Sequence, residues 1–135
     1  MKKFVVLLLA LALIPSIQSC KKKEEPKPSA KELLTQDAWY HFKNETYDSN
    51  GNLTNSQTRN NKMVFAPSND YYYYNNTGQI SEYGTWRLTD NDTKIEMLEH
   101  SDTQAASFNI DKLTESEFTI SIAFGSVKYV LYFKR

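Results

Sequence analysis

The sequence has little of several residue types on which common protein classes depend. It contains one cysteine, two histidines, four glycines and four prolines in 135 residues. A single cysteine excludes an internal disulfide. His41 and His100 lie far apart and outside any zinc motif, and a zinc site needs three or four ligands. There is neither a glycine-rich phosphate loop nor the strained turn that presents a nucleophilic serine. The sequence therefore predicts no enzyme, no metal and no cofactor.

Acidic residues offer the remaining route to catalysis or metal binding. Two segments, beginning at Asp48 and Asp90, start like calcium loops but lack the glycine at position six and the glutamate at position twelve. Their composition is that of turns. Four glutamates could pair as glycosidase carboxylates, although a charged solvent-facing surface gives the same pattern: Glu96, Glu99, Glu115 and Glu117.

No hydrophobic run is long enough to span a membrane as a helix. The longest, from Phe4 to Ile14, has about eleven residues where roughly 20 are needed. It follows Lys2 and Lys3 and precedes a small residue, which is the layout of a secretory signal peptide over residues 1–19. The chain then becomes abruptly charged after Cys20.

The segment Ile17-Gln18-Ser19-Cys20 resembles the lipobox of bacterial lipoproteins. The resemblance implies cleavage before Cys20 and acylation of this cysteine with diacylglyceryl and palmitate-type chains. Stable anchoring needs two or more such chains, because each buried CH₂ contributes only about 0.8 kcal/mol. The implied partner of the N-terminus is the membrane.

Residues 20–31 are predicted to form the lipidated N-terminus and a flexible linker. Charged residues and prolines without apolar residues cannot bury enough surface to fold. Within this segment, Lys23-Glu24-Glu25 resembles the signal that sends Bacteroidetes lipoproteins to the cell surface. The resemblance implies a lipid-anchored protein of the outer membrane, with possible exposure on the cell surface.

Residues 32–135 have the length of one domain. Nine lysines and arginines oppose fourteen aspartates and glutamates there, so the net charge is about −5. The acidic excess argues against nucleic-acid binding, and we expect a monomer. After a helical turn at 32–35, the alternation of residues predicts strands over 40–46, 53–59, 62–66, 71–74, 80–88, 94–98, 105–110, 117–124 and 127–134.

This spacing of short strands and turns predicts an all-β fold. No interval is long enough for a crossover helix, so an antiparallel up-and-down barrel of about eight strands is expected. Closure removes the unpaired edges of an exported sheet. The last two strands should supply an apolar inner face: Phe118, Ile120, Ile122, Tyr129, Leu131 and Phe133.

The order of motifs resembles the lipocalin-like domains of Bacteroidetes lipoproteins. It includes the early Trp39, the aromatic run 71–74 and the segment Gly84-Thr85-Trp86-Arg87-Leu88. Asp37 replaces the glycine of true lipocalins, so the resemblance is to the broader lipocalin-like group. The near-terminal arginine of the family, which packs on the early tryptophan, has a loose counterpart in Arg135. The resemblance implies a barrel able to hold something apolar.

Four aromatic residues are the candidates for ligand binding: Tyr72, Tyr74, Trp86 and Tyr129. Alternation puts Tyr72 and Tyr74 on one face and Tyr71 and Tyr73 on the other. The alternative is that one pair belongs to the core and the other shields the sheet. Two functions follow: a membrane-anchored protein that binds a small apolar ligand or a protein partner, or a structural, accessory surface lipoprotein with a filled barrel and no ligand.

Overall fold

The computed structural model describes residues 26–135. The predicted signal peptide, Cys20 and the first part of the linker lie outside the described residues. The elements are α1 (Ala30–Thr35), β1 (Trp39–Tyr47), β2 (Leu53–Phe65), β3 (Asp70–Tyr74), β4 (Ile80–Thr89), β5 (Lys94–Glu99), β6 (Ala106–Leu113), β7 (Glu117–Phe124) and β8 (Val127–Lys134).

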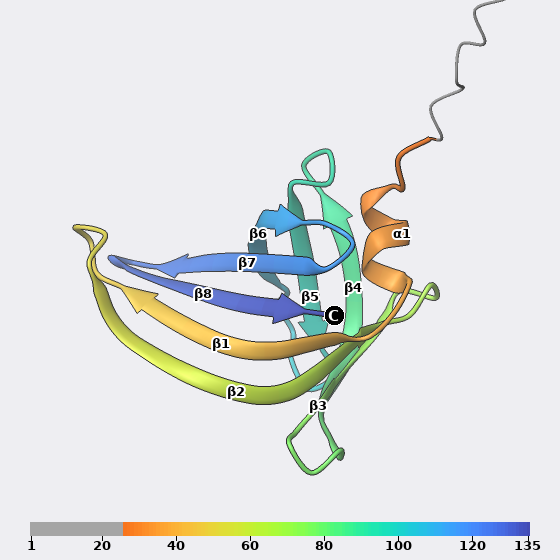
Figure 1. The fold of residues 1–135 in the computed structure, drawn as a ribbon, viewed down its shortest axis with the longest axis horizontal. Coiled ribbons are helices and arrows are strands. Elements are labelled where there is room, and N and C mark those ends of the chain that lie inside the picture. The colour runs from red at the N-terminus through yellow and green to blue at the C-terminus, as the bar shows by residue number, and fades with distance from the viewer. Residues whose placement is uncertain (1–25) are drawn as a thin grey trace, which may run out of the picture.

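The eight strands form one closed antiparallel barrel in which each strand pairs with its neighbours in sequence and β8 returns to β1 (Figure 1). This confirms the expected up-and-down topology. The expected strands 53–59 and 62–66 are one continuous strand, β2. Asn60 and Asn61 do not break it, because β2 pairs with β1 on both sides of a register shift, at Thr58 and at Asn61.

The core lies where the barrel meets α1. Trp39, Phe65, Phe118 and Phe133 are almost fully buried, and their rings contact one another in tilted or edge-to-face arrangements. Such geometry suits aromatic quadrupoles. The expected inner residues Phe118, Ile120 and Phe133 are thus confirmed as core.

Helix α1 starts at Ala30, two residues before the expected turn. Ser29 and Glu32 form a capping box, in which Ser29 Oγ accepts from Glu32 N and Glu32 accepts from Ser29 N. The helix places Leu34 in the core, where its carbonyl accepts from Trp39 Nε1 at 3.1 Å. Among residues 26–135, no helix has the length and apolar character needed to cross a bilayer.

Arg135 fastens the chain end onto this core. Its guanidinium lies 4.0 Å from the centre of the Trp39 ring, and it donates to the carbonyls of Leu33 and Glu115. The contact that the family resemblance implied for a near-terminal arginine is therefore present. Arg135 links α1, β1 and the turn between β6 and β7.

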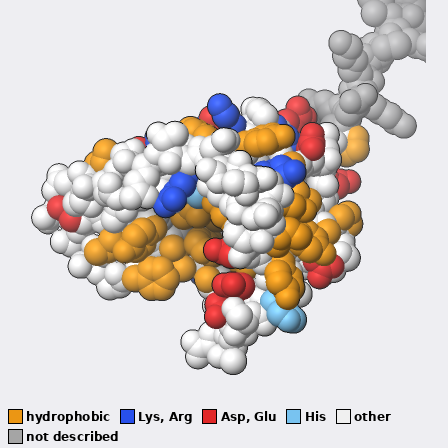
Figure 2. Space-filling model, turned by 90° about the horizontal axis from the view of Figure 1, so that it is seen from below, with side chains coloured by type: hydrophobic (Ala, Val, Ile, Leu, Met, Phe, Trp, Pro, Cys, Tyr) orange, Lys and Arg blue, Asp and Glu red, His pale blue; other side chains and the backbone are white. Residues whose placement is uncertain are grey.

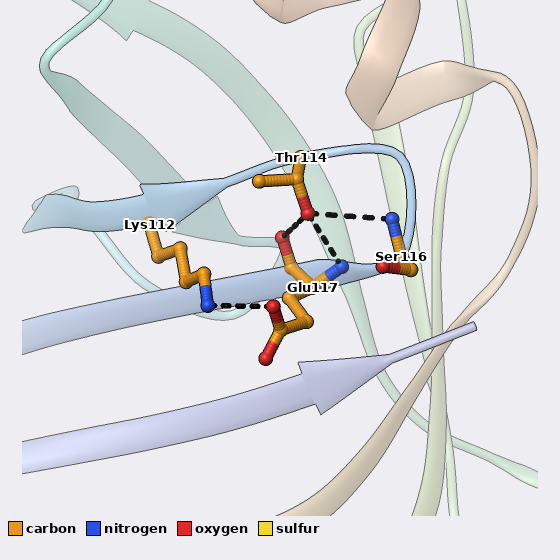
Figure 3. A network of polar contacts seen from close by, with 4 residues as sticks. All are labelled: Lys112, Thr114, Ser116 and Glu117. Atoms are coloured by element: carbon orange, nitrogen blue, oxygen red, sulfur yellow. Dashed lines mark hydrogen bonds and ion pairs between the residues drawn. The ribbon is translucent and has the colours of Figure 1, made fainter.

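The β6–β7 turn is held by its own side chains (Figure 3). Thr114 Oγ1 accepts from Glu117 N at 3.0 Å and from Ser116 N at 3.4 Å, and Lys112 pairs with Glu117 at 2.5 Å. The ion pair is half-exposed, so its contribution to stability is small. The backbone bonds of Thr114 fix the turn beside Arg135.

The opposite end of the barrel is open. The β1–β2 and β7–β8 hairpins project well beyond β4, β5 and β6 (Figure 1). Toward their tips the inner face becomes exposed: Ile122 is partly buried and Tyr129 is 40% exposed. The apolar face predicted from alternation therefore extends past the closed part of the barrel.

Candidate functional site

A cavity of ≈ 420 Å³ opens into the barrel above the aromatic core. Seen from below, the molecule has a hollow with hydrophobic surface inside and acidic side chains at its edge (Figure 2). The cavity is lined by His41, Asn44, Arg59, Asn61, Met63, Tyr71, Tyr73, Glu82, Met97, Glu99, Asp102, Ala106, Phe108, Ile120 and Leu131.

The floor of the cavity is apolar. Met63, Met97 and Ile120 are buried, and Phe108 and Leu131 pack against them from β6 and β8. Thioether side chains are flexible and polarisable, so Met63 and Met97 can adapt to apolar ligands of different shape. The floor can therefore accept an apolar body without a fixed outline.

A hydrogen-bonded chain runs along one wall, from Arg59 through Asn44 and His41 to Tyr73. Because Arg59 can only donate, the Asn44 amide turns its oxygen to Arg59 Nε, at 3.0 Å, and its nitrogen to His41 Nε2. His41 then carries its proton on Nδ1 and donates to the Tyr73 hydroxyl at 2.5 Å. The proton of Tyr73 is left to donate into the cavity.

His41, the histidine of this hydrogen-bonded chain, is neutral. His41 is 3% exposed and stacks on Phe133 with ring centroids 4.6 Å apart. Burial, and the positive charge of Arg59, lower the pKa of His41. Both ring nitrogens are occupied by Tyr73 and Asn44, so the arrangement holds Tyr73 in place.

The adjoining wall, on β4 and β5, is acidic. Glu82 comes from β4, Glu99 ends β5, and a turn in which Asp102 N donates to the Glu99 carbonyl at 3.0 Å adds Asp102. Enclosure by the cavity walls, and the charges of Glu99 and Asp102, raise the pKa of Glu82. Burial and the three acids raise the pKa of Tyr71 to about 12.

Strand register explains why these residues meet. Tyr73 pairs with Met63 on one side and Glu82 on the other, and Tyr71 pairs with Phe65 and Gly84. Gly84 in turn pairs with Glu99. Because residues directly opposite in a sheet share a face, each tyrosine lies in a row with one of the carboxylates.

A β-bulge at Phe42 brings His41 and Asn44 onto the same face. The register between β1 and β2, and between β1 and β8, shifts between His41 and Lys43. Residues three apart on a regular strand would face opposite sides, but relative to β8 strand β1 has one extra residue, Phe42, which restores Asn44 to the interior. Against β2 the additional residue lies on β2 instead, at Arg59 and Asn60. The bulge is thus required for the chain from Arg59 to Tyr73.

The structure does not bring the four predicted ligand residues together. Tyr72 and Tyr74 lie on the outer face, where Lys62 Nζ stands 4.5 Å from the Tyr74 ring. Trp86 is buried in the core and donates to the Ala66 carbonyl, and Tyr129 lies on the projecting hairpin. None of the four lines the cavity.

Instead, the other pair of the tyrosine run, Tyr71 and Tyr73, faces inward. A run of four tyrosines has the same pattern on both faces, so its sequence cannot say which pair is inside. The inward pair could have been identified from the neighbouring strand, because Tyr73 and Tyr71 pair with Met63 and Phe65, while Tyr74 pairs with Lys62. This inference requires the strand register, which the sequence does not give.

A second hollow, of ≈ 580 Å³, lies on the outer face beside the β1–β2 turn. Its lining includes Tyr132, whose hydroxyl donates to Glu45 at 2.5 Å; Tyr47 donates to the same carboxylate at 2.6 Å. These bonds lower the pKa of Glu45 to about 2. The polar groups are already satisfied by each other, so we regard the cluster as structural.

Among residues 26–135, no three histidine, cysteine, aspartate or glutamate side chains are arranged to hold a metal ion. Comparison with known protein families gives no match, and no curated protein matches the chain. Among solved structures, a lipocalin-like protein from Bacteroides uniformis is similar, with a TM-score of 0.53 and 12% identity over 76% of this chain and 98% of that chain. At this identity, the similarity establishes a lipocalin-like fold.

Proposed function

We propose that this lipocalin-like barrel is the binding domain of a lipid-anchored lipoprotein and holds a small, largely apolar ligand in its cavity. The observation that carries the proposal is the cavity volume of ≈ 420 Å³. Ligand sites usually measure roughly 300–1,000 Å³ and combine apolar walls with a few convergent polar groups. Met63, Met97 and Ile120 supply such a floor, and Tyr71 and Tyr73 supply the polar groups.

The competing proposal is a structural or accessory lipoprotein with a filled barrel, which acts through its outer surface. A filled barrel leaves no space of ligand size inside, and the volume of this cavity favours binding over that alternative. We assign no catalytic part to His41, because Tyr73 and Asn44 occupy both of its ring nitrogens.

Filling the cavity tests the binding function. In Ala106→Phe, a phenyl ring should project into the cavity, because Ala106 pairs with the inward-facing Met97. We expect binding of the neutral fluorescent probe N-phenyl-1-naphthylamine to weaken by about tenfold or more, equivalent to about 1.4 kcal/mol. Fluorescence titration measures the loss, and circular dichroism checks the fold.

The matched control is Ala123→Phe, which adds the same ring at an exposed position of β7. It should bind the probe like the unmodified protein. Equal binding by all three proteins would contradict the proposed cavity. Native mass spectrometry of protein purified gently from its own membrane would identify a retained ligand.

The anchoring half of the proposal rests on the sequence around Cys20. In Cys20→Ala, the full-length chain should remain uncut and leave the outer-membrane fraction, because no sulfur remains to accept acyl chains. Ser19→Ala keeps a small residue before the cleavage site and should be processed and anchored normally. Fractionation with immunoblotting measures both, and membrane retention of a cut Cys20→Ala chain would refute lipidation.

A further inference from the structure

Three carboxylates at the cavity mouth have no cationic partner among residues 26–135. Glu82, Glu99 and Asp102 line one side of the cavity, and no ion pair within the described part of the chain involves any of them. Like charges at close quarters repel. Burial, and then the charges of Glu99 and Asp102, raise the pKa of Glu82. The wall therefore carries uncompensated negative charge.

In the part of the chain that the structure describes, one arginine lines the cavity, and it donates its hydrogen bonds to neutral amides. Arg59 stands on β2, on the wall of His41 and Tyr73, where it donates to Asn44 and, at 2.8 Å, to Gln57. Its charge affects the pKa of His41 and Tyr73. The cavity thus has one acidic side and one side on which Arg59 is hydrogen-bonded to neutral amides rather than to a carboxylate.

Tyr71 points independently to a ligand. This residue is 3% exposed and lines the cavity, and its hydroxyl has no hydrogen-bond partner within residues 26–135. The hydroxyl is not among the fully enclosed side-chain atoms without a partner, so it stays open to the cavity, where a ligand can supply the hydrogen bond that such groups normally make. The three carboxylates are near enough that their charges contribute to its raised pKa. An unpartnered hydroxyl therefore stands beside unpartnered carboxylates, above an apolar floor.

We propose that the ligand is an organic cation, a primary or secondary amine on an apolar body. The ammonium group binds among Glu82, Glu99 and Asp102 and donates to the Tyr71 oxygen, while the apolar body rests on Met63, Met97 and Ile120. The inference rests on the proposed binding function and adds the chemical class of the ligand. Low-dielectric walls lined by one sign of charge concentrate the opposite charge and strengthen its attraction.

Three probes that share one apolar body test the inference: 4-phenylbutylamine, 4-phenylbutan-1-ol and 4-phenylbutanoate. They are titrated into the mature, lipidated protein in lipid nanodiscs, with free concentrations measured by dialysis against empty nanodiscs. The ¹³C-labelled methyl groups of Met63 and Met97 report binding, since both line the cavity floor. We expect the amine to bind about tenfold more tightly than the alcohol, and the carboxylate more weakly than either.

Removing the carboxylates locates the effect. In Glu82→Gln/Glu99→Gln, binding of the amine should fall to the level of the alcohol, while the alcohol binds as before. The control, Glu115→Gln/Glu117→Gln, removes the same charge at two exposed positions, one in the β6–β7 turn and one at the start of β7, and should retain the preference. A preference equal in the two double variants would overturn the assigned site.

The outcomes separate the inference from the proposed function. If none of the three probes shifts the methyl signals of Met63 and Met97, the binding function itself is wrong. If the alcohol or the carboxylate binds as tightly as the amine, the cavity binds ligands but the cationic class is wrong. Increased salt should also reduce the preference for the amine, because mobile ions screen partly exposed charges.

Acidification gives a further readout. Lowering the pH from about 7 to about 4 should weaken the preference, because the raised pKa of Glu82 lets this carboxylate take up a proton in that range. His41 and Arg59 face the cavity from β1 and β2, and Tyr71 and Tyr73 from β3; protonation of His41 acts in the same direction. A preference unchanged at about pH 4 would contradict the role of the carboxylates.

Discussion

Trp39→Ala should lower the free energy of unfolding by about 3–5 kcal/mol, the range for removal of a large buried aromatic side chain. The Trp39 side chain is fully buried and packs on Phe118 with ring centroids 5.4 Å apart. Its loss also removes the hydrogen bond to the Leu34 carbonyl and the ring on which Arg135 rests. Urea unfolding followed by circular dichroism measures the change.

Tyr40→Ala is the matched control, one residue along the same strand. The Tyr40 side chain is 51% exposed and points outward, so its truncation should change the free energy of unfolding by only about 0.5 kcal/mol. Similar losses in the two variants would show that Trp39 is not the centre of the closed end.

Gly84→Ala should also lower the free energy of unfolding by several kcal/mol, roughly as much as Trp39→Ala, although it adds only a methyl group. A Cβ at Gly84 would lie 2.0 Å from the Leu98 carbonyl oxygen and 2.9 Å from Glu99 Cα, both backbone atoms of β5. Overpacking costs about 1–3 kcal/mol even where side chains can move, and here a paired strand must move. We expect a loss of about 3 kcal/mol or more.

Gly51→Ala separates this steric cost from the ordinary cost of replacing glycine. Gly51 has φ +79° in the β1–β2 turn, with nothing near the position of its Cβ, so alanine there should cost about 1–2 kcal/mol. Thermal unfolding of both variants gives the comparison. A smaller loss of stability at Gly84 than at Gly51 would mean that the backbone of β5 can shift to make room for the methyl group. Because Gly84 stands between Tyr71 and Glu99 in the sheet, the damage should extend to the cavity.

Strand alternation predicts much of the fold but few of the cavity residues. The clear period of two over 117–124 and 127–134 gives the bounds of β7 and β8 as the structure has them. By contrast, β2 has polar residues on both faces through its exposed half. Local polarity there suggested two strands, whereas pairing with β1 makes one.

The residues of the cavity could likewise not be predicted from local sequence patterns. Asp102 follows the end of β5, and only the turn beneath it brings its carboxylate to Glu99 and Glu82. The bulge at Phe42, which turns Asn44 inward, depends on the register between β1 and β8, and no local residue pattern predicts it. Bulges and turns depend on how neighbouring strands pair, so residues adjacent in the cavity are distant in the chain.

The sequence by itself determined the antiparallel all-β barrel and the apolar face of its last hairpin, because side-chain alternation and turn residues are local properties. It also carries the segment around Cys20 on which the proposed anchor rests. Only the tertiary structure decided that Tyr71 and Tyr73, rather than Tyr72 and Tyr74, face the interior, and that three carboxylates meet beside them. These outcomes follow from register and closure, in which a shift of one residue exchanges the two faces of a strand.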